Sequence, residues 1–222
     1  MLDVIVVGEP TKTGTDIVSL SAMRGHMRMS ATNTALDTVI TDAINDAAAK
    51  LHGDVGELNR TLFPTRWKRY MSRFPDLRND DGTVNALLAG PILLPYGPLL
   101  DDGDVVVTIE DGESPTSLVD PATYVVKTGM LVPEVWPARG LTWPDVDPGP
   151  QAVSMTYTAG YSAFPRPLQR MVKILAAHYV ENPEATINEQ RQMMINRRVD
   201  FGMDDLREAL KIANSLIGWD DD

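Results

Sequence analysis

Residues that could carry out catalysis are few in this chain, and their spacing matches no catalytic motif. The three histidines, His26, His52 and His178, lack the i, i+4 or HExxH spacing that places two imidazoles on one metal ion. No GxSxG nucleophile motif or GxxxxGKS/T phosphate loop occurs, and there is no cysteine to act as a nucleophile or thiolate ligand. A hydrolase that uses His178 would therefore have neither a nucleophile nor a metal set, and we predict no enzymatic activity.

Two acidic clusters carry oxygen ligands of the kind that Ca²⁺ prefers. Asp101, Asp102 and Asp104 form one cluster, and Asp145 and Asp147 form the other. Neither continues into the glycine and distal glutamate of an EF-hand loop. The sequence therefore predicts neither a bound metal nor a cofactor.

Basic and aromatic residues alternate at one place, between Thr65 and Tyr70. Stacking on Trp67, with phosphate contacts from its basic neighbours, would suit a single-stranded nucleic acid, but the same alternation fits an ordinary half-buried strand. The formal net charge of −11 argues against nucleic-acid binding over the whole surface. We interpret this segment as a strand.

Charge is unevenly distributed along the chain. Residues 60–78 include six basic side chains and one acidic one, whereas 101–120 include seven acidic side chains and no basic one. In a homo-oligomeric ring, such surfaces meet between neighbouring copies, because rotation brings different patches together. Two unrelated solvated surfaces are the alternative. The candidates for inter-subunit or channel charge are Arg66, Lys68, Arg69, Asp101, Asp102, Asp104, Glu110, Asp111 and Glu113.

The elements that must position these residues are helices on both sides of a β-rich middle. Apolar periodicity predicts helices over 20–29, 36–51 and 168–179, with Gly53 and Asn182 just beyond two of the ends. Short β-branched and aromatic runs predict strands, which include the segment around Trp67 and residues 105–109, 123–127 and 153–157. Five prolines between Pro133 and Pro150 predict a long loop around Trp136 and Trp143.

A polar stretch, 184–200, leads into a further helix with a broad apolar surface. Asp204 and Asp205 suit its N-terminus and Gly218 suits its end. Such a surface packs either on the protein's own core or on another protein. The candidate partner-binding residues are Leu206, Leu210, Ile212, Ala213, Leu216, Ile217 and Trp219.

Several motifs also occur in a characteristic order. LSAMRGHMRM (20–29) opens the first helix, and TYTAGY (156–161) leads into the helix that starts with prolines. Between them come Phe74-Pro75, Leu94-Pro95 and Pro98-Leu99. With these motifs the chain resembles, over Leu20 to Ala185, the head-tail adaptor (connector) proteins of long-tailed phages and gene transfer agents. The helix after residue 200 departs from that family, whose members usually end soon after the third helix.

The resemblance implies an α+β fold in which a helical bundle, of two N-terminal and the C-terminal helices, carries a β-rich insertion. In this chain the N-terminal segment and helices would occupy 1–56, the β-rich insertion 57–160 and the C-terminal helices 161–222. All three parts would form a single structural unit.

The resemblance also implies a structural protein of the virion's head-tail interface, assembled in the cytoplasm of a bacterial host. It would form a ring of twelve copies on the portal protein and join it to stopper or tail-terminator proteins. DNA would pass through the channel without sequence-specific binding, and the acidic candidates would line it, since like charges repel. No membrane association is expected, because no apolar run approaches the ~20 residues of a span and the N-terminus lacks a basic signal region.

A different class of function is a small β-rich ligand-binding module of a phage tail or baseplate. In that alternative, Trp136 and Trp143 would form an aromatic platform for a glycan. Saturable quenching of tryptophan fluorescence by a glycan would favour it.

Overall fold

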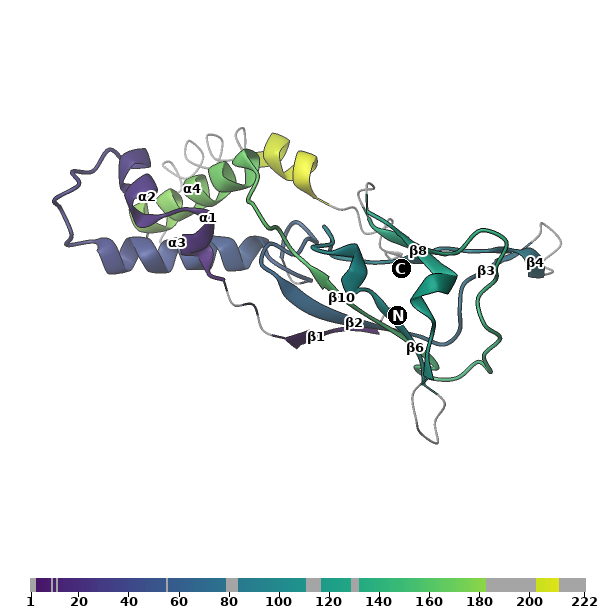
Figure 1. The fold of residues 1–222 in the computed structure, drawn as a ribbon. Helices are drawn as coiled ribbons and strands as arrows, with labels where there is room; N and C mark the ends of the chain where they lie inside the picture. The colour runs from purple at the N-terminus through teal and green to yellow at the C-terminus, as the bar shows by residue number, and fades with distance from the viewer. Residues whose placement is uncertain are drawn as a thin grey trace. The chain divides into compact units, whose positions relative to one another are not determined.

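The computed structural model describes residues 3–8, 10, 12–54, 56–78, 84–110, 117–128, 132–182 and 203–211. Helices and antiparallel sheets occupy different parts of the chain, so the fold is α+β, as predicted (Figure 1). The described residues form two compact units. The sheet unit contains the described parts of 3–10 and 64–161, and the helical unit those of 12–63 and 162–211.

The helical unit confirms the three helices predicted from periodicity, with small differences at their ends. It contains α1 (Gly14–Ile17), α2 (Leu20–His26), α3 (Asp37–Leu51), α4 (Arg166–Glu181) and a helix at 203–210. The apolar stripes of α3 and α4 are buried where the two helices pack on each other. Ser19 caps α2 by accepting a hydrogen bond from the Ala22 amide at 3.2 Å. The predicted gathering of all these helices into one bundle remains a prediction.

A close backbone contact holds α1 against α3. The Gly14 amide donates a hydrogen bond to Asn45 Oδ1 at 3.0 Å. A Cβ atom at position 14 would lie 2.5 Å from the Ile44 carbonyl oxygen, so only glycine allows this approach.

The sheet unit is built on a five-stranded antiparallel sheet. The strand order is β1 (Asp3–Gly8), β2 (Thr65–Met71), β10 (Val153–Ala159), β6 (Val106–Ile109) and β7 (Ser117–Leu118). Tyr157 lies opposite Trp67, and Thr156 lies opposite Lys68. Because side chains alternate along a strand, Trp67 and Tyr157 point into the core from one face of the sheet, whereas Lys68 and Thr156 lie on the other face. We call the second face the outer face.

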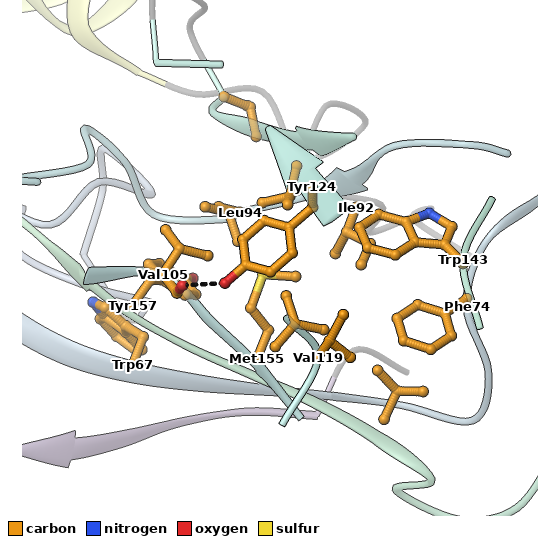
Figure 2. Close-up of a cluster of buried hydrophobic side chains, with 14 of the residues drawn as sticks. Trp67, Phe74, Ile92, Leu94, Val105, Val119, Tyr124, Trp143, Met155 and Tyr157 are labelled. Atoms are coloured by element: carbon orange, nitrogen blue, oxygen red, sulfur yellow. Dashed lines mark hydrogen bonds between the residues drawn. The ribbon is translucent and has the colours of Figure 1, made fainter. Parts of the chain in front are cut away.

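The core of the sheet unit lies between this sheet and a three-stranded sheet. The smaller sheet has the order β5 (Ile92–Leu93), β9 (Glu134–Pro137) and β8 (Tyr124–Lys127), and a separate hairpin-like pair consists of β3 (Asp76–Arg78) and β4 (Val84–Ala89). Figure 2 shows aromatic side chains packed among aliphatic ones, including Tyr124, whose hydroxyl donates to the Val105 carbonyl at 2.7 Å. Tyr157 donates in the same way to the Pro95 carbonyl at 2.7 Å. These bonds satisfy polar atoms that burial would otherwise leave unpaired.

The structure corrects the sequence analysis at two strands. The long loop predicted from Pro133 to Pro150 contains β9, in which Val135 is buried and pairs with both Ile92 and Val126. Strand β1 was also not predicted from the sequence, although its run of β-branched residues is a strand signal. The strands predicted around Trp67 and at 105–109, 123–127 and 153–157 are confirmed.

Candidate assembly surfaces

The outer face of the five-stranded sheet carries an ion pair between the two oppositely charged stretches of the sequence. Lys68 Nζ lies 2.9 Å from Glu110 Oε1, and the same carboxylate oxygen accepts a hydrogen bond from Ser154 Oγ at 2.8 Å. The Lys68 ammonium also lies 4.8 Å from the centre of the Tyr70 ring. Partial burial alone lowers the pKa of Lys68, but hydrogen bonds to Glu110 and Tyr70 outweigh it and raise this pKa. Lys68 and Glu110 therefore neutralise each other within one copy of the chain.

The other two basic candidates lie on opposite faces of β2. Arg66 is exposed on the outer face, opposite Gly8 and Thr158. Arg69 lies on the core face, where it donates a hydrogen bond to the Leu93 carbonyl and its Nε has no partner. Burial disfavours the charged form of each side chain. It therefore lowers the pKa of Arg69 and raises the pKa of the neighbouring Tyr157 hydroxyl. Arg66 is thus the basic candidate that is both exposed and placed on the outer face.

The acidic candidates of the 101–104 turn lie at one end of the same sheet. Asp101 accepts a hydrogen bond from the Gly103 amide at 3.0 Å and caps the 3₁₀ turn η1 (Asp102–Asp104). Asp104 accepts a hydrogen bond from the Thr158 hydroxyl of β10. All three aspartates are exposed. Asp111 and Glu113 lie outside the described residues, and within the described part of the chain no three His, Asp or Glu side chains are placed to hold a metal ion.

The helix at 203–210 buries part of its apolar surface within the helical unit. Met203 and Leu210 are buried, Leu206 is half-buried, and Arg207 forms an ion pair with Glu57 at 2.6 Å. Of the partner-binding candidates, Ile212, Ala213, Leu216, Ile217 and Trp219 lie outside the described residues. Met203 was not among the residues selected from the sequence, although it lies seven residues, or about two helical turns, before Leu210 and so on the same face.

The two outermost strands of the five-stranded sheet expose apolar side chains that the sequence analysis did not select. Ile5, Val6 and Val7 of β1 are consecutive and all exposed, and so is Leu118 of β7. A run of β-branched residues close to the start of the chain was the available signal for β1. The exposure itself depends on which strand lies at the edge of the sheet, which the sequence does not reveal.

The histidines occupy three different environments. The Nδ1 atom of His52 accepts a hydrogen bond from the Leu62 amide at 3.1 Å, and its ring packs on Phe63. Burial lowers the pKa of His52, which favours the neutral ring that can accept this bond. His178 lies 3.3 Å from Asn182 through its Nδ1 atom, and His26 is exposed on α2. His52 and His178 therefore stabilise the local structure around them.

The tryptophan platform of the ligand-binding alternative does not form. Trp143 is buried, stacks on Phe74 at 5.0 Å between ring centres, and donates from Nε1 to the Gly90 carbonyl at 3.0 Å. Trp136 is half-buried on β9, with the Lys127 ammonium 4.5 Å above its ring. One of the two indoles is thus a core residue, and a glycan cannot stack on it.

No protein-family model and no curated protein matches this chain. Among solved structures, it is similar to a chain in the neck of an empty gene transfer agent (GTA) particle computed with C6 symmetry. That match has a TM-score of 0.65 and 19% identity, and it covers 95% of both chains. A chain in the virion of a native GTA particle matches with a TM-score of 0.57 and 18% identity, over 95% of this chain and 96% of that one.

These likenesses establish a shared fold. They extend over nearly the full length of all the chains compared, so both the helical unit and the sheet unit have counterparts. Among the described helices, none has the length and hydropathy needed to span a membrane.

Proposed function

We propose that this chain is a structural head-tail adaptor of a tailed virion or gene transfer agent. The observation that carries the proposal is the fold match to a chain of a GTA neck along 95% of both chains. The adaptor motifs between Leu20 and Ala185 support the same conclusion from the sequence. A fold alone does not fix a function, but two independent lines here point to the same part of a particle.

In this proposal the chain forms a ring on the portal protein and joins it to stopper or tail-terminator proteins. A ring of twelve copies is compatible with the sixfold symmetry of the neck structure that shares the fold. Weak contacts suffice for each copy, because the portal presents many sites at once and neighbouring adaptors bury further surface. The helical bundle with a β-rich insertion is the arrangement expected for such a subunit.

The ring would surround a channel through which DNA moves without sequence-specific binding. The net charge of −11 disfavours adhesion of DNA to the protein. Asp101, Asp102 and Asp104 are exposed and suit a channel wall that repels phosphates. The protein would act in the virion at the head-tail interface after assembly in the bacterial cytoplasm, and it would catalyse no reaction.

The test is to mix the purified chain with the portal ring encoded by the same genome and to image the product by electron microscopy. We expect a second ring on the portal, with a mass that corresponds to one adaptor per portal subunit. The portal alone and the chain alone serve as controls. A chain that stays monomeric in the presence of its portal would contradict the adaptor function.

A further inference from the structure

Strand β1 is an edge strand whose central apolar side chains are exposed. Ile5, Val6 and Val7 are 48%, 44% and 53% exposed, so apolar side chains face solvent on both sides of the strand. Its free edge is not occupied by any other described strand. Soluble proteins protect such edges with charged residues, prolines, β-bulges or very short strands. β1 has Asp3 at its start and a register irregularity between Val6 and Gly8, but its centre is an exposed apolar run.

At the opposite edge of the same sheet, the two-residue strand β7 also exposes an apolar side chain and has no further neighbour among the described strands. Leu118 of β7 is 72% exposed. Because Leu118 lies opposite Thr108, and Thr108 opposite Ser154, Leu118 is on the outer face. Ile5 is on that face as well, since it lies opposite Lys68. The five strands alternate in direction, so β1 and β7 run the same way.

Charge differs between the two edges in a complementary way. At one end of the sheet, Arg66 is exposed beside Gly8 of β1. Across β10 at the same end, Asp101 and Asp102 are exposed beside the start of β6. If two copies are placed edge to edge in the same orientation, Arg66 of one copy faces the aspartates of the next.

We propose that the partner of β1 is a second copy of this chain, whose β7 edge pairs with β1 so that one sheet continues from copy to copy. This inference rests on the proposed adaptor function in one respect, because it places the contact between β1 and β7 in the adaptor ring. The contact is heterologous, because two different patches of each copy meet, and repetition of such a contact gives a ring where the rotation between copies closes. Parallel pairing of β1 with β7 would bring Ile5 and Leu118 together on one face and shield both from water.

Pairing of β1 with β1 of another copy would not have these consequences. It would use the same patch on both chains and give a closed dimer, with Leu118 still exposed. It would also leave the exposed Asp101 and Asp102 without a nearby Arg66 from the next copy. The opposite charges of the two edges therefore favour the head-to-tail arrangement.

Disulfide trapping tests the proposal, because the chain has no cysteine of its own. The double variant Ile5→Cys with Leu118→Cys is assembled on portal rings, oxidised and run on a denaturing gel without reductant. We expect a ladder of covalent multimers and loss of most of the monomer. The control combines Ile5→Cys with Val125→Cys, which is also exposed (50%) but lies in the three-stranded sheet, and it should give no ladder.

The outcomes separate this inference from the adaptor function. Rings that are intact by microscopy but give no ladder would overturn the sheet continuation and leave the adaptor function standing. Dimers from Ile5→Cys alone would instead establish pairing of β1 with β1. If the chain does not bind the portal but still gives a ladder in solution, the result would support the sheet continuation and contradict the adaptor function.

A second measurement needs no substitution. Amide hydrogen exchange of residues 5–7 in the wild-type chain should slow at least tenfold on assembly, because the outward-facing amides of β1 gain partners. Unchanged exchange at these residues in intact rings would overturn the proposal.

Discussion

At the scale of single residues, the sheet unit is held by buried polar side chains that bond to backbone carbonyls. Tyr124, Tyr157 and Trp143 each donate to a carbonyl from an otherwise apolar environment. Such bonds add little net free energy, but leaving the partner unsatisfied is costly. They fix which loop lies on which strand, which an apolar contact alone does not do.

Removing one of these hydroxyls should lower stability measurably. Tyr157→Phe leaves the Pro95 carbonyl without its donor, so we expect the free energy of unfolding to fall by about 1–3 kcal/mol. For a chain of this length that corresponds to a decrease in Tm of about 2–4 °C per kcal/mol. Tyr70→Phe is the comparison, because it removes a hydroxyl whose hydrogen bond to Lys68 lies at a partly exposed position where water replaces it, so the loss should be smaller. Equal effects of the two variants would show that the buried bond is unimportant.

The environment of His52 predicts a pH dependence of stability. Its pKa is lowered by burial in the folded state, so below the unfolded pKa of about 6.5 the unfolded chain binds a proton that the native chain resists. The contribution of His52 is therefore present at neutral pH and is lost as the pH falls below the unfolded pKa and then through the lowered pKa of the folded state. We expect His52→Asn, which keeps an acceptor for the Leu62 amide, to lose less stability over this range than the wild type in urea titrations. Parallel curves for the two proteins would contradict this prediction.

At the scale of elements, glycine identity decides how closely two helices approach. Gly14→Ala would place a Cβ 2.5 Å from the Ile44 carbonyl oxygen and push α1 away from α3. We expect a loss of about 1–3 kcal/mol in the free energy of unfolding. Gly25→Ala in α2 is the matched control, because nothing lies within 4 Å of the added Cβ and alanine favours a helix, so it should be neutral or stabilising. A Gly14→Ala protein as stable as Gly25→Ala would mean that α1 does not pack as described.

The sequence predicted elements best where the pattern was long or strictly periodic. Residues 36–51 and 153–157 gave a helix and a strand because each buries one face continuously. Strand β9 was missed because prolines at 133 and 137 indicate a loop, whereas both can be accommodated at the ends of a four-residue strand. The opposite charges of 60–78 and 101–120 were visible in the sequence, but the pairing of Lys68 with Glu110 inside one copy depends on the strand order, a tertiary property.

The helix at 203–210 also connects sequence to packing at this scale. We expect Met203→Ala to destabilise the helical unit by about 2–5 kcal/mol, because Met203 is buried and truncation leaves a cavity. Glu208→Ala, at an exposed position of the same helix, should change stability little. Thermal unfolding of the two variants gives the comparison. Equal Tm values would mean that the helix does not pack within this chain, so that its apolar face is available to bind another protein.

At the scale of the whole molecule, the fold separates a helical unit from a sheet unit, and the exposed apolar strands belong to the sheet unit. A subunit that must stay soluble before assembly gains from a high net charge, which keeps copies apart. Assembly then requires local attraction that overcomes this general repulsion. Opposite charges at two edges of one sheet provide such attraction without changing the overall sign.

This balance predicts a specific dependence on salt. Arg66→Glu makes both edges of the sheet acidic, so at low ionic strength we expect the chain to assemble on portal rings roughly tenfold more slowly than the wild type. Arg139→Glu is the matched control, because Arg139 is also exposed in the sheet unit and the change in net charge is identical. Light scattering during assembly measures both rates. Near 1 M salt, where screening acts over about 3 Å, the difference between the variants should vanish. If Arg139→Glu slows assembly as much as Arg66→Glu, net charge alone controls the rate and the edge has no special part in it.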